Sequence, residues 1–381
     1  MSPRDIPWVI EPQTKIKHQL LDDYIGGWFS IMFSNQAKYG YEKKLVYVDG
    51  FSGPGEYWCD DLKKDKTPGS PILIAERANK FLEADRSRKF IMICVDNDKK
   101  CVSHLGALLK ALNKFGQGWE VYHKSFEESM GELFDYLDEQ KANIAPAFFF
   151  VDPFGYGGFS MKTMARILKH QRTEVFINFM HYDITRFLDA GHSQGILKDL
   201  FDTDEYKKAS SMNSDDKTSF LMNLYCDQLR RVAKASFILP FRMNTPSQGT
   251  RPRYFLIHAS QHIKALKVMK NTMASNSSQP FRFEAIGIGS DRQLDLFRPS
   301  DEERLEQRIY EFLAEHKEPK IPYMQCEDWA YQHTPGIDRD IKKALVAMEK
   351  VGTIVIERKA RQQKTTVTNG AMILRPSNDR K

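Results

Sequence analysis

Residues 44–55 run Lys44-Leu45-Val46-Tyr47-Val48-Asp49-Gly50-Phe51-Ser52-Gly53-Pro54-Gly55. This apolar, β-branched run ends at an acid, and a glycine-rich turn follows at once. Buried strands of parallel sheets have such runs, and open α/β sheets bind nucleotide-like ligands at the carboxyl ends of their strands. Gly53 and Gly55 lack a Cβ, so the backbone can turn sharply there and approach a ligand closely. The stretch therefore predicts a buried parallel strand that carries Asp49 to a ligand site.

Six more segments have the composition of strands. Helical patterns separate the first four, and this alternation of strand and helix predicts a parallel, doubly wound sheet. The last two are joined by a short loop and predict an antiparallel hairpin. We therefore expect an α/β fold with a mostly parallel sheet of seven strands. The six segments are Phe90–Val95, Trp119–His123, Ala147–Val151, Glu174–Phe179, Ser236–Arg242 and Arg253–Ala259.

Five parallel strands and a terminal hairpin are the order of class I S-adenosylmethionine (SAM) methyltransferases, and dinucleotide dehydrogenases have another order. Residues 1–40 are expected to form an N-terminal helical segment, because apolar residues recur at spacings of three and four over Thr14–Lys38. The methyltransferase-like domain is expected over residues 41–298, with a helical insertion at about 189–234. Residues 299–381 show three helical patterns and then two strands around a basic turn, which predicts a winged helix-turn-helix domain.

Composition and charge limit the possible classes. Of the 381 residues, 41% are hydrophobic and 28% charged, which is typical of a soluble globular protein and too apolar for a disordered one. The net charge of +6 permits a polyanionic partner. No signal peptide is recognisable, and no run approaches the ~18 apolar residues of a membrane span. Five scattered cysteines without a CxxC pair predict a reduced, cytoplasmic protein with no structural metal site.

The strand ends predict a cofactor site if the methyltransferase interpretation is correct. The turn with Phe51, Gly53 and Gly55 would lie under the methionine part of SAM, and Asp49 would contact the SAM ammonium directly or through water. Asp96 would accept both ribose hydroxyls, since a carboxylate offers two oxygens. The adenine would meet two residues after the third strand, Ser125 and Phe126. The alternative is another nucleotide-binding domain of this architecture, or one that has lost its ligand.

The end of the fourth parallel strand, Asp152-Pro153-Phe154-Gly155-Tyr156, resembles the Asp-Pro-Pro-Tyr type motif of amino-methyltransferases that act on adenine or cytosine. A base amine is a poor nucleophile because its lone pair is delocalised into the ring. Asp152 and the Pro153 carbonyl could accept its two N–H bonds and localise that lone pair, while Phe154 or Tyr156 stacks on the extruded base. Phe154 stands where the motif has proline, which leaves other acceptors open. Alternatively, Asp152 caps the loop and Phe154 packs in the core.

Two further groups of residues are candidates for contact with a substrate. Asn178, His181 and Arg186 follow the fifth strand, where they could position an acceptor or a phosphate, or form an ordinary polar rim. Residues 342–364 hold seven basic and two acidic residues, which places positive charge on the third helix and the turn of the C-terminal domain. That charge favours nucleic-acid contact, with protein contact as the alternative. The proposed contacts are Lys342, Lys343, Lys359, Arg361 and Lys364.

Taken together, these motifs resemble the three-Cys-motif partner protein family, which is found in bacterial and phage settings. The matching segments lie within about residues 44–275 and comprise Val48–Gly55, Gly69–Pro71, Val151–Gly155, Ile177–Phe179 and Tyr254–Ala259. The resemblance implies a SAM-methyltransferase-like domain with an appended winged helix. It also implies a partner, a three-Cys-motif protein similar to radical-SAM proteins, and nucleic acid, DNA or RNA, as the substrate of the pair.

The leading prediction is therefore a SAM-dependent methyltransferase that acts on a nucleic-acid base, at an exocyclic amine. Asp152, Pro153 and Phe154 would hold the acceptor, and the polar loop Cys59–Pro68 would close over the site. An alternative from another class is a non-catalytic adaptor that docks nucleic acid and recruits the partner. A third is a nuclease or base-modifying enzyme with a different cofactor in the same crevice.

Overall fold

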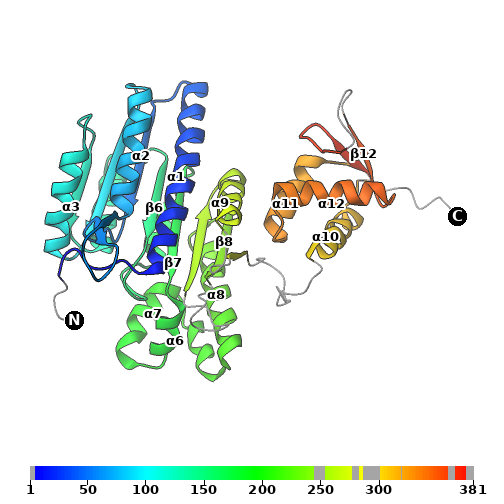
Figure 1. Cartoon of the computed structure of the whole chain (residues 1–381). Helices are drawn as coiled ribbons and strands as arrows, with labels where there is room; N and C mark the ends of the chain where they lie inside the picture. Colours follow the sequence, from blue (N-terminus) through cyan, green and yellow to red (C-terminus); the bar gives the residue numbers. More distant parts are fainter. Residues whose placement is uncertain are drawn as a thin grey trace. The chain divides into compact units, whose positions relative to one another are not determined.

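The computed structural model describes residues 5–243, 254–276, 283–285, 301–318, 320–358 and 365–374. The chain divides into two compact units, residues 1–283 and residues 284–381. Figure 1 shows both units, and each is described here by itself. No helix within the described ranges is long and apolar enough to cross a membrane.

The first unit is built on an eight-stranded sheet. Its strand order is β10-β8-β9-β7-β6-β1-β4-β5, and β9 runs antiparallel to both of its neighbours. The pairs of β1 with β4, β1 with β6, β4 with β5 and β6 with β7 are parallel. The predicted mostly parallel sheet and its terminal hairpin are thus confirmed, and β10 is an additional short strand. The strands are β1 (Lys44–Asp49), β4 (Lys89–Asp96), β5 (Trp119–His123), β6 (Ala147–Val151), β7 (Thr173–Phe179), β8 (Phe237–Met243), β9 (Tyr254–Ser260) and β10 (Phe283–Ala285).

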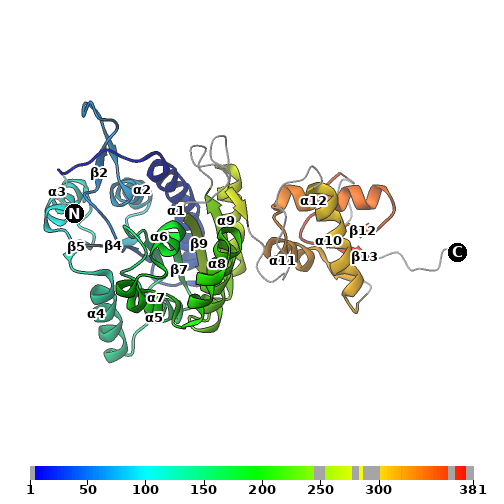
Figure 2. The same cartoon turned by 90° about the horizontal axis from the view of Figure 1, so that it is seen from below.

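Helices cover both faces of this sheet (Figure 2). On one face lie α1 (Pro12–Tyr39), α2 (Ser70–Ala84), α3 (Lys99–Leu112) and α9 (Ile263–Ser275). On the other face lie α4 (Phe126–Glu139), α5 (Met161–Leu168), α7 (Gln194–Phe201) and α8 (Ser214–Arg231). Because both faces are covered, every residue of β6 and β7 is buried, and the residues of β6 are all apolar.

The chain reverses its direction of travel through the sheet between β1 and β6. From β1 it proceeds outward to β4 and β5, and it then returns to the other side of β1 with β6 and β7. Such a switch point leaves a crevice at the carboxyl ends of the strands. In register, Asp49 pairs with Cys94 of β4 and with Phe150 of β6, so Asp49, Asp96 and Asp152 all lie at this edge.

Two local features could not be read from the sequence. The segment Cys59–Pro68 was predicted as a loop over the site, and its last three residues form β3 (Lys66–Pro68), which pairs antiparallel with β2 (Glu56–Trp58). Gly69 holds the cap position of α2, and Ser70 is the first helical residue. The Ser70 side chain is instead turned toward the Asp49 carboxylate, which it stabilises in its charged form.

The region around residues 189–234 is helical, as predicted. It begins after the short α6 (His181–Phe187) and contains η1 (Gly191–Ser193), α7, η2 (Glu205–Ser211) and α8. The aromatic rings of Phe201 and Tyr225 pack on Phe179 at the end of β7, with centroids 6.2 and 4.7 Å away. The segment therefore shares the core of the sheet.

The second unit contains three helices and a small antiparallel sheet of order β11-β13-β12. Its apolar core comes from all three helices and includes Ile309, Leu313, Ala330, Ile341 and Leu345. The elements are α10 (Asp301–Glu315), β11 (Lys320–Pro322), α11 (Tyr323–His333), α12 (Asp338–Lys350), β12 (Val355–Glu357) and β13 (Met372–Leu374). Three helices followed by two strands were predicted, and all five are present in the described residues.

Candidate ligand and acceptor site

The deepest group at the carboxyl edge of the sheet is Asp49. Its side chain is fully buried, and Tyr47 Oη donates a hydrogen bond of 3.0 Å to its Oδ2. Among the described residues its other oxygen, Oδ1, has no hydrogen-bond partner. Burial raises the pKa of Asp49 to about 7, while the nearby Ser70 and Tyr47 hydroxyls oppose that rise. A buried, half-satisfied carboxylate is costly unless a ligand donor completes it, which makes Asp49 a candidate binding group.

Asp96 fastens the glycine-rich turn to the next strand. Its Oδ2 accepts a hydrogen bond of 2.8 Å from the Gly53 backbone N–H, and its Oδ1 accepts one of 2.8 Å from the Asp98 N–H. Burial raises its pKa, and these two backbone donors oppose the rise. Each carboxylate oxygen can accept a second hydrogen bond, so Asp96 keeps one acceptor position on each oxygen. The predicted contact with two ribose hydroxyls is compatible with this geometry and stays a prediction.

The glycines of the turn have packing roles. Gly53 and Gly55 have φ values of +59° and +83°, a region that favours glycine. A Cβ on Gly55 would lie 2.6 Å from Leu105 Cδ1 of α3, so a methyl group does not fit there. The same holds at Gly50, where a Cβ would lie 2.6 Å from the Phe126 ring. The turn is therefore pressed onto α3 and α4, whether or not a ligand approaches it.

The two residues expected near adenine have structural partners. Ser125 caps α4, and its hydroxyl accepts a hydrogen bond of 3.2 Å from the Glu128 N–H. Phe126 is buried, and its ring lies 5.7 Å from that of Phe51. Phe51 is half-buried. Of the two rings, only that of Phe51 therefore presents an appreciable surface to a ligand. The adenine contact of Phe126 stays a prediction.

Asp152 lies across the switch point from Asp49, and its electrostatic influence raises the pKa of Asp49 further. Lys17 Nζ of α1 donates to both Asp152 oxygens, at 2.7 and 2.6 Å. Asn178 Nδ2 at the end of β7 donates to Oδ1 at 2.6 Å. Three segments far apart in the sequence thus meet at one carboxylate, which brings together the predicted residues Asp152 and Asn178.

Sequence reasoning missed Lys17. It belongs to the buried face of α1, in step with Leu21, Tyr24 and Trp28 at helical spacings of three and four, and it is itself buried. A lysine in the middle of an apolar stripe is rarely buried without a carboxylate partner, and that was the available signal. Its neighbour His18 is also buried, and this burial lowers the pKa of His18 to about 4.

The loop after β6 exposes an aromatic ring beside this carboxylate. Phe154 is 71% exposed, so it does not pack in the core. Its ring lies 5.9 Å from that of Trp8 in an edge-on arrangement, and Trp8 in turn lies 5.7 Å from Tyr57 of β2. The N-terminal segment is fixed there by a backbone hydrogen bond of 2.9 Å from Trp58 N–H to the Trp8 carbonyl. An exposed aromatic group next to a polar site can stack on a planar ligand.

The remaining predicted substrate residues are placed differently. Tyr156 is half-buried, its hydroxyl lies 2.6 Å from Ser193 Oγ, and its ring stacks on Phe187. His181 is buried, both ring nitrogens lack partners in the described structure, and burial, followed by Arg242, lowers its pKa to about 4. Arg186 is exposed, with its guanidinium 5.1 Å from the Phe187 ring. Of these residues, only Asn178 contacts Asp152.

The basic residues of the second unit are only partly described. Lys342 on α12 pairs with Asp338 at 2.9 Å, and Lys343 lies on the same helix. Arg358 makes a two-pronged ion pair with Glu349, at 2.7 and 2.6 Å, so its charge is compensated within the unit. The other three predicted contacts, Lys359, Arg361 and Lys364, lie outside the described residues.

No protein-family model matches the chain, and no curated protein does. Among solved structures, it is similar to protein LPL1258 from Legionella pneumophila, at 12% identity over 73% of this chain and 97% of that chain, with a TM-score of 0.39. An O-methyltransferase from Bacillus cereus matches at 11% identity over 66% and 82% of the two chains, with a TM-score of 0.31. The bifunctional kinase-methyltransferase WbdD matches at 10% identity over 98% and 77%, with a TM-score of 0.34.

Such low scores support no argument about ligand or activity, so the assignment of class depends on the sheet itself. When its seven long strands are numbered along the chain, their spatial order is 3-2-1-4-5-7-6, and the seventh strand is antiparallel. This arrangement defines a methyltransferase-like α/β fold.

Proposed function

We propose that this protein is a SAM-dependent methyltransferase that acts on a nucleic-acid base, with an exocyclic amine as acceptor. The observation that carries the proposal is the meeting of Asp49, Asp96 and Asp152 at the switch point of a methyltransferase-like sheet, with the unpartnered Asp49 Oδ1 between the strand ends. A buried carboxylate oxygen without a donor suits the ammonium of the cofactor's amino-acid part, and Asp96 retains acceptors for a ribose. When bound there, SAM would supply the electrophilic methyl group.

The protein's own residues would orient the acceptor. Among the described residues, Asp152 Oδ2 accepts a hydrogen bond only from Lys17, and it can accept one more from a base amine N–H. The Pro153 carbonyl would accept the second N–H, and Phe154 with Trp8 would stack on the base. Lys17 and Asn178 hold the Asp152 carboxylate in one orientation, so the contribution to catalysis would be mainly positioning.

We also propose that the second unit is a winged helix-turn-helix that contacts nucleic-acid phosphates. Support comes from its element order, three helices with an antiparallel β11-β13-β12 sheet, and from the basic residues on and after α12. Replacing Lys359, Arg361 and Lys364 together with Gln should weaken nucleic-acid binding and lower the slope of log K against log salt by about 0.9 per lost phosphate contact. An unchanged slope would assign the unit to protein contact. The three-Cys-motif partner stays a prediction from the resemblance.

The test of the main proposal is calorimetric titration with SAM and S-adenosylhomocysteine, followed by transfer of labelled methyl from SAM to bacterial DNA and RNA. Asp96→Ala should weaken cofactor binding many-fold. Asp152→Asn should keep cofactor affinity and abolish transfer. The control Asp199→Ala, which replaces an exposed acid of α7, should leave both unchanged.

Two outcomes would contradict this proposal. If the folded wild-type protein binds neither SAM nor S-adenosylhomocysteine, Asp49 and Asp96 have structural roles and the adaptor function becomes the better explanation. If Asp152→Asn loses cofactor binding together with transfer, Asp152 maintains the structure of the site and does not select the acceptor.

A further inference from the structure

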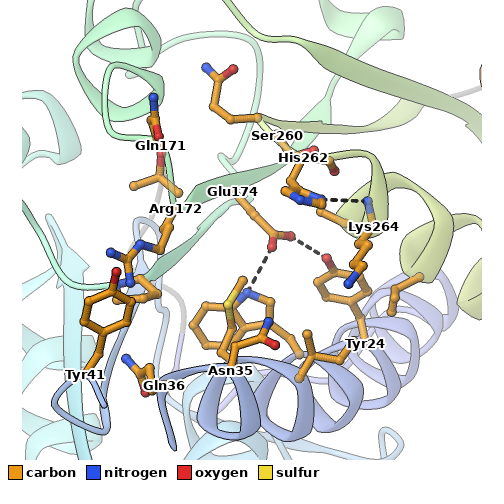
Figure 3. Close-up of a pocket in the computed structure, with 18 of the residues that line it drawn as sticks. Tyr24, Asn35, Gln36, Tyr41, Gln171, Arg172, Glu174, Ser260, His262 and Lys264 are labelled. Carbon is orange, nitrogen blue, oxygen red and sulfur yellow. Dashed lines mark hydrogen bonds between the residues drawn. The ribbon is translucent and has the colours of Figure 1, made fainter. Parts of the chain in front are cut away.

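A cavity of about 410 Å³ lies at the opposite edge of the sheet, where β7 begins (Figure 3). It is lined by the second half of α1, the start of α9, the start of β7 and the end of β9. None of the residues assigned to the cofactor or the acceptor lines it. Along β7, Glu174 in this cavity is four residues from Asn178 at the acceptor site, which corresponds to about 13 Å. The cavity is therefore a separate place in the molecule.

The floor of the cavity carries a carboxylate that is already satisfied. Glu174 is buried and accepts hydrogen bonds from Tyr24 Oη and from Trp28 Nε1, the latter at 3.0 Å. A third contact, of 3.0 Å, joins it to His258 Nε2. Figure 3 shows Glu174 between α1 and the sheet, with the Tyr24 hydroxyl directed at it. Tyr24 and Trp28 are themselves buried, at 1% and 2% exposure, so an occupant meets a closed floor that has little need for a cation.

The walls and the mouth differ in character. Ile31, Met32, Ala265 and Val268 make the walls apolar. The mouth has two aromatic rings that project into solvent, Tyr39 at 63% and Tyr41 at 55% exposure. Exposed aromatic groups around an apolar cavity are a common feature of sites for small, flat molecules.

The mouth is also positively charged. Arg172 and Lys264 line it and are exposed, and no ion pair joins either of them to a carboxylate in the part of the chain that the structure describes. The Arg172 guanidinium lies 4.8 Å from the Tyr41 ring. Glu174 is the only carboxylate among the described lining residues, and it is at the floor. The charges at the mouth favour an anionic group and disfavour a cationic one.

We propose that this cavity binds a small aromatic acid. The ring system lies against the apolar walls of Ile31, Met32 and Val268 between α1 and α9, and its single carboxylate, sulfonate or phosphate is at the mouth beside Arg172 and Lys264. The volume agrees, because pockets for small ligands run from about 300 to 1,000 Å³. A structural role of the Glu174 network explains the floor, but it does not explain the exposed rings and the unpaired cations at the mouth.

The test uses two dyes with the same rings, of which only one carries an anion. 8-Anilinonaphthalene-1-sulfonate should bind the full-length, folded protein saturably at one site, with enhanced fluorescence. N-Phenyl-1-naphthylamine, which lacks the sulfonate, should bind about tenfold more weakly. Excess S-adenosylhomocysteine should displace neither dye, because the two sites are separate.

Three variants test the location. Ile31→Trp should fill the cavity and weaken binding of the sulfonate dye at least tenfold. Arg172→Gln with Lys264→Gln should weaken it about fivefold to tenfold and remove its salt dependence, while binding of the neutral dye is unchanged. The control Lys169→Gln, which removes an exposed lysine that pairs with Asp138 and does not line the cavity, should have no effect.

The proposal is overturned if the sulfonate dye does not saturate, if S-adenosylhomocysteine displaces it, or if both dyes bind equally well. Equal affinity in the charge variant and the wild type would also refute it. The charge variant alters only exposed side chains, so its result is informative even if Ile31→Trp fails to fold. Near-ultraviolet circular dichroism verifies the fold of each variant.

Discussion

The buried ion pair between Lys17 and Asp152 leads to the sharpest prediction. Their side chains are 7% and 15% exposed, so Lys17→Met would leave a largely desolvated carboxylate with Asn178 as its remaining donor among the described residues. Removing one partner of a buried pair costs about 3 to 5 kcal/mol, and the residual exposure of Asp152 places the expected loss near 3 kcal/mol. The free energy of unfolding should be measured by urea denaturation of the full chain, following the transition of the first unit.

The double variant Lys17→Met with Asp152→Asn should lose less free energy of unfolding than the two single variants lose together, with a coupling energy of about 2 kcal/mol. A matched control is available on the surface. Lys43 pairs with Asp85 at 2.7 Å, with side chains 30% and 27% exposed, so Lys43→Met should cost under about 1 kcal/mol. If Lys17→Met lowers the free energy of unfolding no more than this control does, the buried pair stabilises the fold no more than the surface pair. The inference that Lys17 holds Asp152 in place is then refuted.

Three further predictions concern the turn and the loop around the site. The ammonium of SAM requires the ionised form of Asp49, whose pKa is raised to about 7. SAM affinity measured by calorimetry should therefore rise about fifteenfold from pH 5.5 to 7, and in Asp49→Asn it should not change with pH. A pH-independent affinity in the wild type would contradict this prediction. Gly55→Ala should lower the free energy of unfolding by about 1 to 3 kcal/mol more than Gly40→Ala, which has a similar positive φ but open space around it. Equal losses would mean that the contact with Leu105 is unimportant. Phe154→Ala should leave the free energy of unfolding within about 0.5 kcal/mol of the wild type, since the ring is 71% exposed. It should raise KM for nucleic acid at least fivefold, and an unchanged KM would exclude stacking on this ring.

The strands were predictable because their signals are local. A buried parallel strand must be apolar on both faces, so β6 could be located to the residue. β5 is only partly buried, and its β-forming residues Trp119, Val121 and Tyr122 located it equally well. The hairpin of β8 and β9 followed from two strand segments with a short connection. Because parallel strands share one edge, the meeting of Asp49, Asp96 and Asp152 also followed from their places at the strand ends.

What surrounds those carboxylates was not predictable from local patterns. Serine is a residue type that favours helix caps, yet the Ser70 hydroxyl is directed at the Asp49 carboxylate. Phe154 follows an apolar run and could equally have been core, and only the path of the loop leaves it exposed. At both positions, contacts with residues distant in the chain decide between the two possible roles. Local sequence patterns contain no information about such contacts.

By itself, the sequence determined the class of fold, the order of the strands and the edge at which a ligand would lie, because hydrophobic periodicity and turn chemistry act over a few residues. Only the tertiary structure decided that Lys17 pairs with Asp152, across 135 residues of chain, and that a cavity opens between α1 and α9. Both depend on how α1 packs against the sheet. That packing is a sum of many small, non-local contacts, and no single stretch of sequence records it.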